Sequence, residues 1–214
     1  CIRDRLSTLC SFIRGSSLKI HFFLNISNYT NYGLMLPIYS NHGENNMLYL
    51  KKLNTYDNEL EYLYLKDLPL NENGFINNLH NISKEEFMEV SLPKLINYSN
   101  GIDLPSGYVP ETNYFLWNEK TIVGLFRLRH FLNDSLRNGS GHIGYQIHRN
   151  FRRMGFASSG LALAIDEAKK IIPDDEVYMS TRLDNIASLK VQLHNNAYIH
   201  HTDNEHYYTR IRIK

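Results

Sequence analysis

The sequence has few cysteines, no long apolar run and almost no net charge, and each of these absences narrows the class of protein. Its only cysteines, Cys1 and Cys10, lie close together at the start, so no disulfide framework holds the remainder and a reducing, cytoplasmic compartment is expected. No apolar run approaches the roughly 18 residues that span a bilayer, so no membrane partner is expected. The formal net charge of +1 argues against a nucleic-acid partner, since such binders usually carry a strong basic excess.

What remains is typical of one globular domain with an extension. The chain has 214 residues, of which 43% are hydrophobic, enough for one well-filled core. Residues 1–46 show neither helical nor strand periodicity. We interpret them as a poorly packed extension: a leader, a truncated upstream region, or a mistranslated segment with Met47 as the true start. Residues 47–214 are regularly patterned and are expected to form the domain.

The first part of this patterned region predicts one strand followed by helices. We expect a strand at 48–53 and then a helix capped by Asp57. The apolar positions expected to face the core from this helix are Leu60, Leu63 and Tyr64. Residues 71–80 are typical of a loop. Residues 83–86, Ser-Lys-Glu-Glu, match a capping box and predict a second helix, which Pro93 is expected to kink.

The second part predicts strands interrupted by two helices. Strands at 113–117 and 121–130 flank a short polar turn and indicate a hairpin. A strand at 142–148 leads to a helix at 157–172, whose apolar stripe is Leu161, Ile165, Ala168 and Ile172. The remaining expected elements are a strand at 176–180, a helix at 185–195, and strands at 198–201 and 206–213. This order predicts a mixed α/β sheet with one strand–helix–strand crossover.

The most informative segment joins the strand at 142–148 to the helix that follows it. It carries Arg149, Arg152 and Arg153 and a glycine, Gly155, directly before the helix. Unpaired backbone N–H groups and the positive end of the helix dipole converge at such a point and attract anions. Guanidinium groups add planar donors suited to phosphate. The segment therefore predicts a ligand that carries phosphates, in particular a pyrophosphate.

These residues resemble motif A of the GCN5-related N-acetyltransferase (GNAT) superfamily, Gln/Arg-x-x-Gly-x-Gly/Ala, which Arg152, Gly155 and Ala157 satisfy. Other segments are similar, in the same order, to a subgroup of small bacterial-type acetyltransferases; they are residues 107–112, 127–130, 141–145 and 184–188. The resemblance covers about residues 47–214 and leaves 1–46 unmatched. It implies a GNAT fold: a mixed central sheet of about six or seven strands flanked by about four helices. It also implies a splayed strand pair at the acetyl-CoA site.

The resemblance further implies that acetyl-CoA is the co-substrate and that the acetyl group passes directly to an amine in a ternary complex. The cofactor pyrophosphate would bind to Arg152, Arg153 and the backbone N–H groups of Met154, Gly155, Phe156, Ala157 and Ser158. The strand around Gln146 and Ile147 would pair with the pantetheine arm. Asn185 would contact that arm near the thioester, and glycine at 155 would permit close approach of the backbone.

Direct transfer requires a neutral amine, a donor to the oxyanion and a proton source for the thiolate. The candidate bases are Glu111 and His142, acting directly or through water. In the alternative interpretation, Glu111 caps a helix or pairs with an arginine, and His142 is a hydrogen-bonded core residue. Many relatives place a tyrosine acid on the last helix, where this sequence has Gln192, which cannot supply a proton as phenol does. Tyr145 and Tyr198 are possible substitutes.

Other classes of function fit less well or remain open. A Rossmann turn would need a glycine-rich loop directly after its strand, whereas arginines fill this one, and no Gly-Lys-Ser/Thr of a P-loop occurs. The histidines at 194, 200, 201 and 206 lack tetrahedral spacing, so no metal is expected. The alternative to an enzyme is a CoA-binding sensor or interaction module that has lost catalysis.

The acceptor is left open by the sequence. Its pocket is expected between residues 57–98, 104–112 and 131–140, where acidic groups would favour a cationic amine. A small amine, an amino acid, an antibiotic-like molecule, and a protein N-terminus or lysine all remain candidates. A monomer or homodimer is expected. Asn195 and Asn196 stand where relatives often have glycines, which puts the local turn in doubt.

Overall fold

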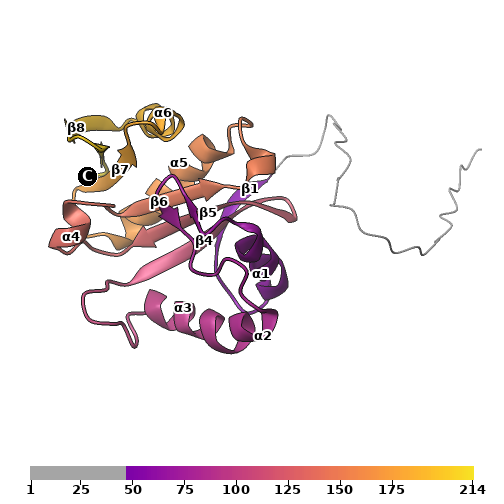
Figure 1. Ribbon diagram of the computed structural model, residues 1–214. Helices are drawn as coiled ribbons and strands as arrows, with labels where there is room; N and C mark the ends of the chain where they lie inside the picture. The colour runs from indigo at the N-terminus through magenta and orange to yellow at the C-terminus, as the bar shows by residue number, and fades with distance from the viewer. Residues whose placement is uncertain (1–46) are drawn as a thin grey trace, which may run out of the picture. The chain divides into compact units, whose positions relative to one another are not determined.

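An antiparallel sheet in the order β1-β4-β5-β6 forms the centre of the fold (Figure 1). The computed structural model describes residues 47–214, so the extension expected at 1–46 lies outside the described residues. The strands of this sheet are β1 (Leu48–Lys52), β4 (Glu111–Asn118), β5 (Thr121–Arg129) and β6 (Ile143–Ile147). β4 and β5 form the expected hairpin, because Glu119 and Lys120 complete a tight connection.

A second antiparallel sheet, in the order β7-β9-β8, follows the crossover helix. Its strands are β7 (Glu176–Arg182), β8 (Tyr198–Thr202) and β9 (His206–Arg212). Within residues 47–214, β6 and β7 share no ladder, and the bridge that joins them is an isolated one between Gly141, just before β6, and Met179. The pair is therefore open beyond that bridge, as a splayed strand pair requires.

Helices cover both faces of the central sheet (Figure 1). One face carries α5 (Phe156–Ile171), with α6 (Ile186–His194) beside it. The other face carries α1 (Asn58–Asp67) and a longer helical segment made of α2 (Lys84–Glu86), a π-helical turn (Phe87–Ser91) and α3 (Leu92–Ser99). A short helix, α4 (Asp134–Arg137), lies between β5 and β6. Each helix of the described chain is too short or too polar to cross a bilayer.

Alternation along the strands gives the sheet two separate cores. Side chains on the α5 side include Phe126 and Leu128, which pack with the predicted helix stripe Leu161, Ile165, Ala168 and Ile172. Side chains on the other side include Phe115 and Leu125, which pack with Tyr64, Leu65, Phe87 and Leu92. This alternation decides which residues of β4, β5 and β6 can face a common site.

The predicted buried face of α1 is wrong in part. Leu60 and Leu63 are about half exposed, whereas Glu61 is fully buried beside Tyr64. Glu61 accepts hydrogen bonds from the backbone and side chain of Asn54 at 3.2 and 3.1 Å. Burial raises the pKa of Glu61 to about 8. The helix is therefore rotated to bury a carboxyl group that binds the preceding loop, which apolar periodicity does not reveal.

Three local expectations are refined by the structure. Residues 71–80 are not a simple loop, since β2 (Asn71–Glu72) and β3 (Phe75–Ile76) form a hairpin. Its two-residue turn, Asn73-Gly74, has positive φ at both positions, as Asn-Gly turns do. Asp57 stands at the start of α1 but makes no capping bond and pairs with Lys51. The disturbance expected at Pro93 takes the form of the π-helical turn that directly precedes it.

Gly160 provides a test of the packing between α5 and the sheet. A Cβ at this position would lie 2.7 Å from Phe126 Cε2 and 2.8 Å from Leu116 Cδ2, both in the buried core. Alanine favours a helix by about 1 kcal/mol over glycine, but overpacking costs about 1–3 kcal/mol. We expect Gly160→Ala to lower the free energy of unfolding in urea, whereas the exposed neighbouring change Ser159→Ala does not. A stabilised Gly160→Ala would show that the helix sits further from the sheet.

Candidate functional site

The N-terminus of α5 presents unused backbone donors. Gly155 occupies the N-cap position, and no side chain caps this end. The N–H groups of Ser158 and Ser159 bond to Gly155 O at 3.0 and 3.1 Å. Those of Gly155, Phe156 and Ala157 have no acceptor among the described residues. Three free donors thus lie at the positive end of a 16-residue helix, which is an arrangement that binds anions.

Backbone conformation explains why glycine stands at position 155. Its φ is +83°, in the left-handed region that side chains disfavour. An added Cβ would meet nothing within 4 Å, so the space beside the turn is open. Arg153, two residues earlier, also has a positive φ of 63°. Such conformations cost energy and gather at functional sites, which makes this turn a candidate for one.

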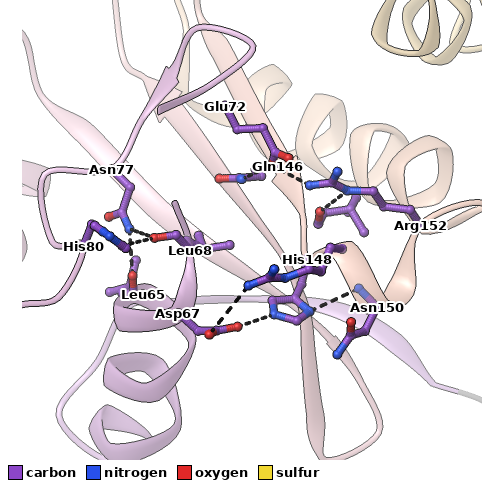
Figure 2. A network of polar contacts seen from close by, with 12 residues as sticks. Leu65, Asp67, Leu68, Glu72, Asn77, His80, Gln146, His148, Asn150 and Arg152 are labelled. Carbon is purple, nitrogen blue, oxygen red and sulfur yellow. Dashed lines mark hydrogen bonds and ion pairs between the residues drawn. The ribbon is translucent and has the colours of Figure 1, made fainter. Parts of the chain in front are cut away.

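Arg152 does not point freely into solvent (Figure 2). Its Nε donates to the carbonyl of Ile147 at 3.0 Å, and its Nη2 lies 2.5 Å from the Glu72 carboxylate of the β2–β3 hairpin. The side-chain amide of Gln146 donates to the same carboxylate oxygen at 2.5 Å. Arg152 and Glu72 neutralise each other, and the pKa of the Glu72 carboxyl is lowered by this guanidinium despite the opposing effect of burial. Arg153 is exposed and has no ion-pair partner among residues 47–214.

Further polar contacts fix the turn on its two sides. Asp67, at the end of α1, pairs with His148 at 2.7 Å (Figure 2). The Asn195 amide donates to the carbonyl of Ser158 at 3.1 Å and so ties the end of α6 to the first turn of α5. The next residue, Asn196, adopts a φ of 63°, so asparagine makes the left-handed turn where relatives often have glycine.

The structure brings the strand residues of the predicted site next to this turn. Ile147 packs on the α5 side, whereas Gln146 faces the opposite side and is buried. Asn185 caps α6 by accepting from the N–H of Ser188 at 3.2 Å. Ser188 in turn bonds to the hydroxyl of Tyr145 on β6 at 2.8 Å. The start of α6 therefore lies against the open edge of β6, which places Asn185 near the gap between β6 and β7.

His142 lies beyond the N-terminal end of β6, away from Gln146 and Ile147. It is fully buried, and its Nδ1 accepts from the backbone N–H of Tyr178 at 3.0 Å. That bond leaves the proton on Nε2, which lies 3.3 Å from the Asp174 carboxylate. Burial lowers the pKa of His142 to about 4. Both ring nitrogens are thus engaged, as the alternative interpretation of His142 expected, and its role as a base stays a prediction.

Glu111, at the start of β4, faces two arginines of β5. Its carboxylate lies 3.2 Å from Nε of Arg129 and 4.0 Å from Nε of Arg127. The alternative in which Glu111 pairs with an arginine matches this geometry. Its side chain keeps 27% of its surface exposed, so water reaches the carboxylate. Its role as a base also stays a prediction.

A buried polar chain occupies the place of the tyrosine that many relatives have on the last helix. Gln192 is buried, accepts from the Thr209 hydroxyl at 2.8 Å and donates to Ser188 Oγ at 3.3 Å. Ser188 joins this chain to Tyr145, whose pKa burial raises to about 12. Tyr198 instead lies on β8 and donates to Glu176 at the surface. Of the two candidate tyrosines, only Tyr145 belongs to the open strand pair.

The fold and the turn together match what an acyl-coenzyme A-dependent class of transferase requires. The chain belongs to the acetyltransferase (GNAT) family, whose family model matches residues 76–193, more than half of its length. This membership supports acetyl-CoA-dependent acetyl transfer as the general reaction. No curated protein matches the sequence.

Solved structures share the fold at low sequence identity. One is a GNAT-family acetyltransferase from Streptococcus pneumoniae, 14% identical with a TM-score of 0.54, covering 78% of this chain and 100% of its own. Another is the N-acetyltransferase PseH from Campylobacter jejuni in complex with acetyl coenzyme A, 17% identical with a TM-score of 0.51 and coverages of 78% and 100%. A third is spermidine N-acetyltransferase from Vibrio cholerae with CoA and spermine, 14% identical with a TM-score of 0.52 and coverages of 78% and 96%. At these identities the likeness shows the fold alone.

The environment of His142 predicts how stability depends on pH. Its pKa falls from an ordinary 6.5 to about 4 on folding, so the unfolded chain binds more protons between these pH values. The contribution of neutral His142 to the free energy of unfolding is therefore complete above pH 6.5 and is lost as the pH falls toward 4. The loss should reach about 3 kcal/mol.

The measurement compares the wild type with His142→Gln, which can still accept from the Tyr178 N–H. Urea unfolding from pH 7 to pH 4 should show the stability advantage of the wild type shrinking. Parallel profiles for the two proteins would show that His142 is not held neutral.

Proposed function

We propose that residues 47–214 are an acetyl-CoA-dependent N-acetyltransferase domain that transfers the acetyl group directly to an amine acceptor in a ternary complex. The observation that carries this proposal is the set of free N–H groups at Gly155, Phe156 and Ala157, beside the opening between β6 and β7. The pyrophosphate of acetyl-CoA needs hydrogen-bond donors such as these N–H groups. Its amide-bearing pantetheine arm needs an opening such as the one between β6 and β7. Both features lie at the C-terminal end of the same strand.

The cofactor would use this arrangement in two parts. The pyrophosphate would bind the N–H groups of residues 154–157 together with Arg153, and Arg152 would join it on release from Glu72. The Ser158 N–H, which was also expected to bind it, is instead bonded to Gly155 O. The pantetheine arm would run along Gln146 and Ile147 as an added strand, with Asn185 near the thioester. The similar proteins solved with acetyl coenzyme A or CoA support this use of the fold.

The chemistry would be addition of a neutral amine to the thioester carbonyl, followed by departure of the CoA thiolate. The ammonium proton would leave through water to Glu111, whose carboxylate is partly exposed. His142, the second candidate, could accept it only if Nδ1 released the Tyr178 N–H. Tyr145 is the favoured donor to the thiolate, because its hydroxyl lies on β6 at the open strand pair and is held by Ser188 at 2.8 Å. A CoA-binding sensor without turnover is the alternative, and it differs in releasing no free thiol.

The phosphate turn can be tested with a matched pair of glycine variants. Gly155 and Gly107 have almost the same φ, +83° and +82°, and neither has an atom within 4 Å of an added Cβ. Gly155→Glu would put bulk and negative charge into the turn, so calorimetry should show acetyl-CoA affinity falling by at least about a hundredfold. Gly107→Glu introduces the same strain and charge elsewhere and should bind normally.

The same experiment can overturn the proposal. Normal acetyl-CoA affinity in Gly155→Glu would show that the pyrophosphate does not bind at this turn. Absence of a binding heat for the wild type with either CoA or acetyl-CoA would remove the transferase assignment. If the protein bound acetyl-CoA but released no thiol with any amine of a panel, the CoA-binding sensor would be the function that stands.

Glu72 provides a second test, because it competes with phosphate for Arg152. Glu72→Gln removes the carboxylate charge and keeps an oxygen for Gln146. A partly exposed ion pair is worth up to about 1 kcal/mol, so CoA should bind up to about fivefold more tightly. Glu59→Gln, which breaks a surface pair with Lys84, is the control and should leave the affinity unchanged. Weaker binding in Glu72→Gln would mean that Glu72 positions Arg152 for the ligand.

A further inference from the structure

Arg127 and Arg129 form a positively charged pair on the face of the sheet that α5 does not cover. They alternate with the core residues Phe126 and Leu128 on β5, so both side chains point to the side of the β2–β3 hairpin. Glu111 lies directly opposite Arg129, and Asn113 lies opposite Arg127. The pair is half-buried, with 21% and 18% of the two side chains exposed.

Only one carboxylate balances these two guanidinium groups. Glu111 contacts both through their Nε atoms. Nη1 of Arg127 donates to the carbonyl of Ile76 at 2.7 Å, and Nη1 of Arg129 donates to that of Gly141 at 2.9 Å. Neither Nη2 has a hydrogen-bond acceptor in the described part of the chain. Because an unbalanced and partly desolvated charge is costly, the site is better matched with a second anion than without one.

The acidic side chains of α1 do not supply that second anion. Glu61 is turned into the interior against Asn54, and Glu59 pairs with Lys84 at the surface. Glu72 is committed to Arg152 and Gln146. The phenyl ring of Phe75 covers the Arg127 guanidinium at 4.4 Å and shields one side of it. None of these acidic side chains is therefore available as the second partner of the two arginines.

An independent observation lies on the neighbouring strand. Gln146 is 5% exposed, and its Oε1 has no hydrogen-bond partner in the described structure. The Glu72 carboxylate can only accept, so it holds Nε2 and fixes Oε1 as the atom left without a donor. Arg127 is opposite Gly144, which makes Gln146 its diagonal neighbour on the same face, about 7–8 Å away. A buried acceptor without a donor is costly and indicates a missing N–H group.

We propose that Arg127 and Arg129 bind an anionic group of the acceptor, a carboxylate or a phosphate, while Gln146 Oε1 accepts a hydrogen bond from its amine. The acceptor is then a small zwitterionic or amino-phosphate molecule and not a polyamine. This inference rests on the proposed acetyl transfer, because it assigns the second substrate of the same site. Gln146 belongs to the strand proposed for the pantetheine arm, so an amine held there lies on the path to the thioester.

The test measures thiol release from acetyl-CoA by the full chain with paired amines. L-Phenylalanine and L-lysine are each compared with the amine formed by decarboxylation, and glucosamine 6-phosphate is compared with glucosamine; spermidine is added as a polycation. For at least one pair we expect kcat/KM to be about tenfold or more higher with the anionic member. The amino-acid arm and the sugar-phosphate arm distinguish a carboxylate from a phosphate.

Variants then show which residues cause the preference for the anionic acceptor. Arg129→Gln and Arg127→Gln should abolish it, chiefly by raising KM for the anionic member, with unchanged calorimetric affinity for CoA. Arg127 also anchors the hairpin, so Arg127→Lys provides a second variant that keeps the charge and loses the planar fork; KM should rise there as well. Arg212→Gln, at an exposed position on β9, is the matched control and should behave as wild type.

The outcomes separate this inference from the proposed function. If CoA binds and the uncharged or cationic member of every pair reacts as well or better, the anionic acceptor is wrong while acetyl transfer stands. If CoA binds and no amine releases thiol, both fail and the sensor alternative holds. If arginine variants that bind CoA normally keep the preference, the anion binds elsewhere and the inference is overturned.

Discussion

The structure depends on how the first turn of α5 is held beside the end of β6. The left-handed conformation at Gly155 ends the connection between β6 and α5. It leaves three N–H groups without acceptors at the N-terminus of the helix. Contacts from Asn195 to Ser158 and from Asp67 to His148 hold this turn from opposite sides. Because the donors are fixed before any ligand arrives, an anion binding there pays little to order them.

β6 separates two chemically different faces of the sheet. On the α5 side, Ile143, Tyr145 and Ile147 are packed into a core, and only the Tyr145 hydroxyl leads out, toward Ser188. On the hairpin side, Gly144 and Gln146 adjoin the arginines of β5. A thioester in the gap beside β6 would thus meet a phenol from one side and a charged surface from the other. Two substrates could thus approach one strand from different sides and meet at Gln146.

Local patterns predicted the parts of the fold that short-range physics determines. The β4–β5 hairpin and the α5 stripe are confirmed because their signals lie within a few residues of one another, whereas anion binding at the turn before α5 stays a prediction. The β2–β3 hairpin was missed although Asn73-Gly74 is a strong local signal. The face of α1 and the partner of Arg152 could not be predicted, since Asn54 and Glu72 reach them through tertiary contacts. Gln146 was predicted for its backbone, and its unpaired oxygen becomes visible only once Glu72 is placed.

Glu72 links the two halves of the site more directly than any other residue. It lies on a hairpin whose next strand carries Phe75 and Ile76, both in contact with Arg127. Its carboxylate also holds Arg152 at the phosphate turn and Gln146 on β6. A pyrophosphate that draws Arg152 away would leave Glu72 bound to Gln146 alone and would change the position of the hairpin over Arg127. In the proposed site, one carboxylate would thus contact both the donor and the acceptor side, and any coupling between these sides would act equally in both directions.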